Sequence, residues 1–365
     1  MRFLHTADWQ IGMKASAYGE AASRIRGERL SAAKRVIEVA QNHKVDFILV
    51  AGDIFEDNGV DRGLIQRVVD TLNIFNGPVF IIPGNHDPLV PGSVWEHPAW
   101  KSASNVLILR EDKPIGIPGG FLYPCPIRER HSGRNPLAWI AAEKSQFIRV
   151  GLAHGTVEGI RQDEPDYPIP RDAAKTAGLD YLALGHWHSS ATYAGSDQAV
   201  HMAYSGTHET TKFGERDSGN VLIVEISAAD APPSITPVRT AGISWIMLEK
   251  DIRERGEFAF VRGQIESIAN PDNALIDINL TGILMADERS ELNHIEDILS
   301  SRFLWGRLDV SRLRLSPEDE TWIKSLPAGI IQEAAIRLRD NPALVPEASA
   351  RALIELYSLM REIEQ

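Results

Sequence analysis

The sequence predicts an α/β fold, and three observations support this prediction. First, apolar runs typical of strands alternate with segments of helical periodicity, the pattern of a sheet covered by helices. Second, the chain of 365 residues is longer than a single core usually needs, so we expect two domains or one large domain with an appendage. Third, polar residues directly follow several predicted strands, as they do where such sheets bind ligands.

Strands and helices alternate regularly in the first part of the chain. The helical segments show apolar residues three and four positions apart, whereas the strands are short apolar runs. Ligands of such sheets bind beyond the carboxyl ends of the strands. The predicted strands lie at residues 2–7, 45–51 and 79–82, and the predicted helices at 23–43 and 62–75.

Further elements are predicted after residue 91, where the pattern is less regular. The proline-containing segment 228–233 predicts a turn or linker, and we expect a domain boundary near Thr240. The expected parts are a first domain (1–239), a smaller α/β domain (240–316) and C-terminal helices (317–365). The predicted strands lie at 147–153, 181–184, 202–204, 221–226, 274–280 and 307–315, and the predicted helices at 286–301, 328–339 and 346–363.

The composition excludes several classes of protein. The 50 acidic and 38 basic residues give a net charge of -12, so any contact with DNA must be local rather than due to bulk charge. The single cysteine, Cys125, can form neither an internal disulfide nor a cysteine-based zinc site, and we expect it to be buried. No apolar run is long enough to span a membrane, and polar residues follow Met1 too closely for a signal peptide. We expect a soluble cytoplasmic protein.

Five short segments place metal-ligand residue types at the ends of predicted strands. Most of them are weak signals alone, because a Gly-Asp pair is common and two histidines on one strand face are often just exposed. The segment 84–87, Gly-Asn-His-Asp, is stronger, since it packs an amide, an imidazole and a carboxylate into one turn. Their convergence predicts a metal site. The candidate ligands are Asp8, Asp53, Asn85, His154, His186 and His188.

This mixture of ligand types suits the hydrolysis of phosphodiester bonds. Two divalent ions about 3.5 to 4 Å apart can neutralise charge on the attacking and leaving oxygens and generate a bridging hydroxide as nucleophile. Carboxylate, imidazole and amide ligands suit manganese, iron or zinc, and with no cysteine ligand the harder ions are favoured. His86 then fits the role of general acid, with Asp87 placed to orient it.

The five segments resemble the signature motifs of the calcineurin-like metallophosphoesterases. The segments 5–12, His-Thr-Ala-Asp-Trp-Gln-Ile-Gly, 52–57 and 204–209 more specifically resemble the SbcD-type nuclease subunits of DNA double-strand-break repair. The resemblance runs to about Ile226 and is only architectural past Thr240. It implies a sandwich of mixed sheets flanked by helices, followed by a smaller capping domain that binds DNA and by C-terminal helices.

The resemblance also implies a role for each ligand, with one departure from the family pattern. The implied set is Asp53 as the bridge, Asp8 and His188 at the first ion, and Asn85, His154 and His186 at the second. His86 would be the transition-state histidine. The departure is Gln10, which stands where the family usually has histidine, and an amide oxygen is a weaker ligand than imidazole for most transition metals. Three outcomes stay open: use of a harder ion such as manganese, a loosely held first metal, or loss of activity.

Five residues are candidates for contact with substrate. Four basic residues flank the first motif and can contact DNA phosphates as positioning groups, although a solvated helix face is the plainer interpretation: Lys14, Arg24, Arg26 and Arg29. His208 lies in the turn that matches the family pattern and can approach substrate, with an exposed loop histidine as the alternative.

The two helical patterns at the C-terminus are amphipathic, so they either pack on their own domain or offer a groove to another protein. In the resembling family, these helices dock on the coiled-coil root of an SbcC-like ATPase of the SMC family. The resemblance implies a manganese-dependent DNA exonuclease and endonuclease that works as a homodimer. Two alternatives stay open: a phosphoesterase for nucleotides or phosphoproteins, and a non-catalytic scaffold that binds DNA ends or the ATPase and has a weakened metal site.

Overall fold

The chain folds into two compact units, Met1–Ser244 and Trp245–Gln365. The computed structural model describes residues 1–141, 146–160, 166–195, 198–316, 321–341 and 345–363. The boundary predicted after residue 239 lies shortly before the observed division, and the separate C-terminal part predicted from residue 317 stays a prediction. Among the described helices, none combines the length and apolar character needed to cross a membrane.

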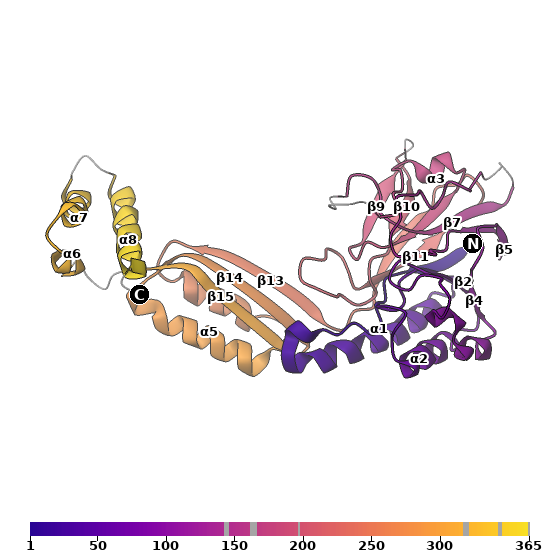
Figure 1. The fold of residues 1–365 in the computed structure, drawn as a ribbon, viewed down its shortest axis with the longest axis horizontal. Helices are drawn as coiled ribbons and strands as arrows, with labels where there is room; N and C mark the ends of the chain where they lie inside the picture. The colour runs from indigo at the N-terminus through magenta and orange to yellow at the C-terminus, as the bar shows by residue number, and fades with distance from the viewer. Residues whose placement is uncertain (142–145, 161–165, 196–197, 317–320, 342–344, 364–365) are drawn as a thin grey trace. The chain divides into compact units, whose positions relative to one another are not determined.

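The first unit contains a six-stranded mixed sheet in the order β12-β11-β1-β2-β3-β4. The strands β1, β2, β3 and β4 are parallel to one another, whereas β11 runs antiparallel to both β1 and β12. Two helices pack on one face of this sheet and bury its apolar side chains, and Figure 1 shows them together on that side. The bounds are β1 (Arg2–Thr6), β2 (Phe47–Ala51), β3 (Val79–Ile82), β4 (Val106–Ile108), β11 (Asn220–Glu225), β12 (Ser234–Arg239), α1 (Ala22–Asn42) and α2 (Arg62–Leu72).

A second six-stranded sheet packs on the opposite face of the first and has the order β5-β6-β7-β8-β10-β9. Phe47 and Leu49 of the first sheet and Leu152 and Ala183 of the second lie in the apolar core that the two sheets share. This arrangement confirms the predicted sandwich of mixed sheets. The bounds are β5 (Ile115–Ile117), β6 (Gly120–Pro124), β7 (Ile148–His154), β8 (Tyr181–Gly185), β9 (Ala191–Ala194), β10 (Val200–Tyr204) and α3 (Ala173–Thr176), with 3-10 helices η1 (Ser16–Ala21), η2 (Val94–Glu96) and η3 (Pro98–Ser102).

The second unit is a three-stranded sheet, β13-β14-β15, with helices packed on it. The strands β14 and β15 are parallel, and the intervening α5 packs on them as a crossover helix. Further helices follow toward the C-terminus. The bounds are β13 (Ser244–Ile252), β14 (Ala274–Leu284), β15 (Trp305–Leu315), α4 (Glu257–Glu266), α5 (Arg289–Arg302), α6 (Thr321–Ser325), α7 (Ile330–Asp340) and α8 (Pro346–Ile363), with 3-10 helices η4 (Pro271–Asn273) and η5 (Ala286–Glu288).

The segment 228–233 forms a turn, one of the two alternatives predicted for it, and not a linker between domains. This segment joins β11 to β12, two antiparallel neighbours within the first unit, so it is a connection inside one sheet. The strand β12 was missed because it lies at the sheet edge, is largely exposed and contains Pro237, which weakens its strand pattern.

Candidate metal centre

The five predicted motif segments come together at one end of the sandwich. Each lies at or just beyond the carboxyl end of a strand: β1, β2 and β3 in the first sheet, and β7 and β8 in the second. Because these strands are parallel within each sheet, their carboxyl ends share one edge, and the two edges meet. Here the backbone N–H of His186 donates to both carboxylate oxygens of Asp8, at 3.0 and 3.1 Å, although the two residues lie far apart in sequence.

Two carboxylates form the buried centre of the site. Ligand atoms of Asp8, Asp53 and His154 all lie within 4.8 Å of one another, and all three side chains are fully buried. Burial raises the pKa of Asp8 to about 6. Burial also opposes ionisation of Asp53, but the neighbouring His154 outweighs it and holds the pKa of Asp53 well below its ordinary value. Buried carboxylates are costly unless they are paired or coordinate a metal, so a bound cation would stabilise this arrangement.

Two imidazoles and one amide form a second group of ligand atoms beside Asp53. The Asn85 side-chain oxygen lies 2.8 Å from Nε2 of His154 and 3.1 Å from Nδ1 of His186. Two neighbouring ligands of one octahedral ion lie about 3 Å apart when each bond is about 2.1 Å long, so these separations suit a shared cation. Burial lowers the pKa of His186 to about 3, and the neighbouring His154 adds to this effect, so the ring is neutral as a ligand must be.

A carboxylate orients His188, which lies beyond β8. Its Nδ1 lies 2.9 Å from the Glu215 carboxylate and 3.0 Å from the Thr211 hydroxyl oxygen, leaving Nε2 for a metal. Burial lowers the pKa of His188, but the hydrogen bond to Glu215 outweighs it and the net pKa is raised. Carboxylate-bound histidines of this kind are common metal ligands. Sequence reasoning missed Glu215, because no motif or spacing connects it to His188.

Four residues of the centre adopt the left-handed backbone region that side chains other than glycine usually avoid. The φ angles are 55° at Asp8, 46° at Gln10, 54° at Asp53 and 105° at His186. Such conformations cost about 1–3 kcal/mol each and persist where the surroundings impose them, typically at functional sites.

The motif glycines are explained by close packing under the same residues. A Cβ atom at Gly84 would lie 2.1 Å from the Asp53 carboxylate, and one at Gly185 would lie 1.9 Å from the Ala51 carbonyl oxygen. Only glycine allows these segments to approach so closely.

Comparisons with known proteins agree with this geometry. Residues 1–190 match the calcineurin-like phosphoesterase family. The chain belongs to this family. It is 25% identical over 274 residues, 70% of this chain, to the Bacillus subtilis (strain 168) protein named uncharacterized metallophosphoesterase YhaO. It is also 25% identical over 259 residues, 59% of this chain, to the SbcD subunit of the SbcCD nuclease of Escherichia coli (strain K12). These matches span 64% and 62% of the two relatives' own lengths.

Members of this family use divalent metal ions, and the donor set of this phosphoesterase fits them. Gln10 supplies a further observation. Its amide nitrogen donates to Asp53 at 3.1 Å, while its side-chain oxygen is buried and has no hydrogen-bond partner among the described residues. A buried carbonyl oxygen without a donor is costly unless a cation or water engages it, so the Gln10 side-chain oxygen is available as a ligand.

His86 of the phosphoesterase is partly exposed beside Asp53, and its backbone N–H donates to Asp53 at 2.9 Å. The structure corrects the role predicted for Asp87. The His86 Nδ1 donates to the Glu56 carbonyl oxygen at 2.9 Å, so Glu56 orients the ring. Asp87 is fully buried and accepts backbone N–H groups from Phe55 at 3.0 Å and Gly84 at 2.8 Å. Asp87 therefore holds the phosphoesterase loops together.

The prediction that His208 contacts substrate is also wrong. His208 is fully buried, stacks on Trp9 with ring centroids 5.0 Å apart, and donates from Nε2 to the Arg29 carbonyl oxygen at 2.8 Å. It packs behind the loop that carries Asp8 and Trp9, where substrate has no access.

Most of the basic residues predicted to contact DNA lie on the surface of the phosphoesterase domain. Lys14, Arg24 and Arg26 are exposed, and Arg26 donates to the Lys14 backbone carbonyl at 2.9 Å. They lie on the loop and first helical turn that follow the Asp8 segment. Their contact with DNA stays a prediction. The same prediction for Arg29 is wrong, because its side chain is buried and donates to backbone carbonyl oxygens.

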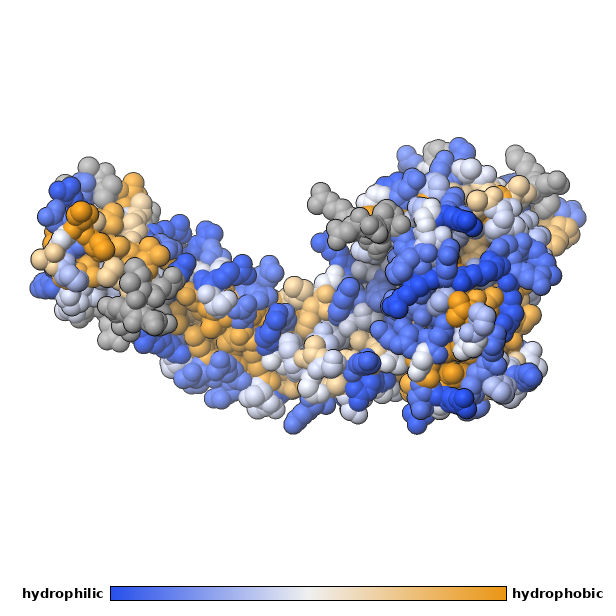
Figure 2. All heavy atoms as spheres, viewed as in Figure 1, coloured by the Kyte–Doolittle hydropathy of each residue, from blue (hydrophilic) through white to orange (hydrophobic). Residues whose placement is uncertain are grey.

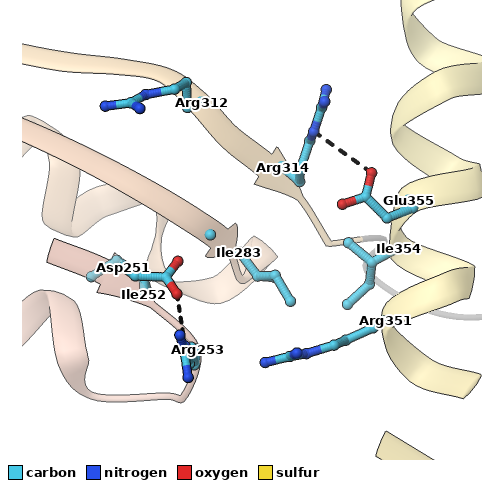
Figure 3. A pocket seen from close by; sticks show the side chains of 10 residues that line it. Asp251, Ile252, Arg253, Ile283, Arg312, Arg314, Arg351, Ile354 and Glu355 are labelled. Carbon is cyan, nitrogen blue, oxygen red and sulfur yellow. Dashed lines mark hydrogen bonds and ion pairs between the residues drawn. The ribbon is translucent and has the colours of Figure 1, made fainter. Parts of the chain in front are cut away.

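The second unit has an arginine-lined hollow of about 280 Å³ between its sheet and α8. Figure 3 shows that two of its four guanidinium groups already face carboxylates: Arg253 pairs with Asp251 at 2.7 Å and Arg314 with Glu355 at 3.8 Å. Arg312 points away from the others, so the four groups do not form a single anion site (Figure 3).

Proposed function

We propose that this chain is a manganese-dependent phosphodiesterase that cleaves DNA and processes DNA ends in double-strand-break repair. The buried cluster of carboxylate, amide and imidazole ligands carries the hydrolytic part of the proposal. The similarity to SbcD subunits of the SbcCD nuclease favours DNA as the substrate.

The residues around the cluster divide into two proposed ion sites that share Asp53. Asp8, Gln10 and His188 would hold the first ion, and Asn85, His154 and His186 the second. When bound, two divalent ions activate water and stabilise the charge that develops on the phosphate. Manganese suits this set because the ligands are carboxylate, imidazole and amide groups, without cysteine.

His86 is the proposed proton donor. Because a carbonyl oxygen only accepts, the ring nitrogen that faces Glu56 must carry a hydrogen. In the doubly protonated ring, Nε2 also carries a hydrogen, which can pass to the leaving oxygen as the P–O bond breaks. The Glu56 carbonyl keeps the ring in place during this transfer.

The proposed contact with DNA is local, as the net charge of -12 requires. Lys14, Arg24 and Arg26 would contact phosphates next to the Asp8 loop. Contacts of this type fix the position of DNA without reading its sequence.

The C-terminal helices are the proposed docking site for an SMC-family ATPase, with the chain working as a homodimer. Figure 2 shows hydrophobic residues gathered over α7 and α8. Exposed apolar surface of this kind commonly marks a protein interface. The exposed apolar side chains here are Ile330, Ile331, Ile336, Val345 and Leu359.

A substrate panel tests this function. The purified chain and its Asp53→Asn variant would be incubated with manganese and, separately, linear duplex DNA, single-stranded DNA, cyclic nucleotides or a phosphopeptide. We expect cleavage of DNA by the parent and none by the variant. If the parent hydrolyses only cyclic nucleotides or the phosphopeptide and leaves DNA intact, DNA is not its substrate. Two bound ions with no hydrolysis of any substrate would favour a scaffold.

A further inference from the structure

We propose that the segment 240–243 is a positioning element for the first metal-binding loop, residues 8–10, acting through the buried side chains of Glu209 and Arg29. This inference rests on the proposed metal site and adds a means by which its geometry is controlled. The segment is the last part of the first unit before β13 continues into the second unit.

Arg29 of α1 joins the metal-binding loop to the turn 207–210. It is a fully buried guanidinium that donates to the Trp9 carbonyl oxygen at 2.8 Å and, more distantly, to that of Asp8 at 3.4 Å. On its other side it donates to the Glu209 carbonyl oxygen at 2.7 Å. A backbone bridge between Ala7 and Thr207 links the same two segments.

The turn 207–210 also holds the segment 240–243. The buried Glu209 carboxylate accepts the backbone N–H groups of Gly242 at 2.7 Å and Ile243 at 3.3 Å. The Thr240 hydroxyl donates to the His208 carbonyl oxygen at 2.6 Å. The segment is therefore fastened to the turn by both its backbone and a side chain.

Arg35 of α1 contacts both the segment 240–243 and Glu209. It donates to the Thr240 carbonyl oxygen at 2.5 Å and lies 3.5 Å from the Glu209 carboxylate, while Glu28 pairs with it at 2.7 Å. A Cβ atom at Gly242 would lie 2.0 Å from Glu28, so the segment packs tightly against α1. One helix thus carries both arginines that link the segment to the metal-binding loop.

The loop needs this external support. Asp8 and Gln10 have φ angles of 55° and 46°, which side chains other than glycine adopt only when the surroundings impose them. Loosening the segment 240–243 frees the turn 207–210 and the Arg29 guanidinium, so the loop can relax. The first ion site then loses its geometry, whereas Asn85 and His154, which Arg29 does not contact, keep theirs.

Two variants test the inference, each with a matched control. Thr240→Val removes the hydroxyl that binds the turn, and Thr236→Val makes the same change at an exposed position of β12. Glu209→Ala removes the carboxylate that holds the segment, and Glu38→Ala makes the same change at an exposed position of α1. Manganese titration by electron paramagnetic resonance gives the affinity of each site. In the test variants we expect the manganese affinity of one site to fall by about 10–100-fold. The affinity of the other site should stay within about twofold of its value in the parent.

Amide hydrogen exchange in the metal-free chain separates this inference from the proposed function. The N–H of Gln10 donates to the Asp53 carbonyl at 3.0 Å, and that of Gly155 donates to the Gly185 carbonyl at 3.2 Å. We expect faster exchange at Gln10 but not at Gly155 in the test variants only. Unchanged exchange at Gln10, or equal weakening of both metal sites, would overturn the inference. A parent chain that binds no manganese would refute the metal site, and the exchange rates would still decide whether the segment positions the loop.

Discussion

Nε2 of His154 lies 2.8 Å from the side-chain oxygen of Asn85. The other ring nitrogen, Nδ1, lies 2.8 Å from the Ala51 carbonyl oxygen and must carry a hydrogen, since that oxygen only accepts. In the neutral ring, the lone pair of Nε2 therefore faces a lone pair of the Asn85 oxygen, and the two repel each other. A proton or a cation must lie between them. The acidic surroundings raise the pKa of His154 to about 9, outweighing the opposite effect of burial, so a divalent ion that binds here displaces a proton.

Replacing Gln10 with histidine should strengthen the first ion site. The Gln10→His variant exchanges an amide oxygen for imidazole, a better ligand for zinc, and we expect about tenfold tighter zinc binding at one site. The Gln10→Ala variant, which has no ligand atom, should bind more weakly than the parent. Competition with a chelating dye measures both. Equal affinities for all three chains would mean that Gln10 does not coordinate the ion.

Replacing His86 should slow cleavage without removing the metals. The His86→Gln variant can still donate to the Glu56 carbonyl but has no proton to transfer, so we expect the turnover rate to fall by about 10²–10⁴-fold. Metal content and DNA affinity should stay the same. The exposed His131 provides a control variant, His131→Gln. Full turnover in His86→Gln would remove this residue from the mechanism.

Exposed basic residues beside the Asp8 loop should set the salt dependence of DNA binding. We expect the double variant Lys14→Gln, Arg24→Gln to bind all DNA sequences more weakly and to lower the slope of log affinity against log salt by about 2. Lys34 and Arg67 are exposed on α1 and α2 away from the motif loops, so their double replacement by glutamine is the control. An equal change of slope in both variants would argue against a specific contact.

The stability of the chain should depend on pH through Glu209. Burial raises the pKa of Glu209 to about 7, so between about pH 4.5 and 7 the folded chain holds a proton that the unfolded chain has released. This contribution is present at low pH and is lost as the pH rises. We expect the free energy of unfolding of Glu209→Gln, relative to the parent, to increase across this range by at most about 3 kcal/mol. Urea unfolding at fixed ionic strength measures it, and a constant difference would contradict the prediction.

Much of the fold was predictable because its strands and helices have clear periodicity. The segment 79–82 matches β3 and 346–363 matches α8 at both ends. The strand β13 and helix α4 were missed. The strand is mostly half-buried or exposed, and the helix has few buried residues, so neither gives a strong apolar pattern.

The ligands could be proposed from sequence because each directly follows an apolar strand, whereas the groups that support them could not. Glu215 and Arg29 act through contacts with residues remote in sequence, which no local pattern reveals. The position of Asp87 next to His86 in the sequence also led to a wrong prediction, that Asp87 orients the His86 ring. Neighbouring side chains in a turn point in different directions, and this carboxylate binds backbone N–H groups instead of the His86 ring.

Anomalous diffraction from crystals grown with manganese tests the central claim most directly. We predict two manganese peaks about 3.5–4 Å apart on either side of the Asp53 carboxylate. One should lie beside Asp8 and His188, and the other beside Asn85 and His154. The absence of both peaks, or peaks bound only outside this cluster, would contradict the account.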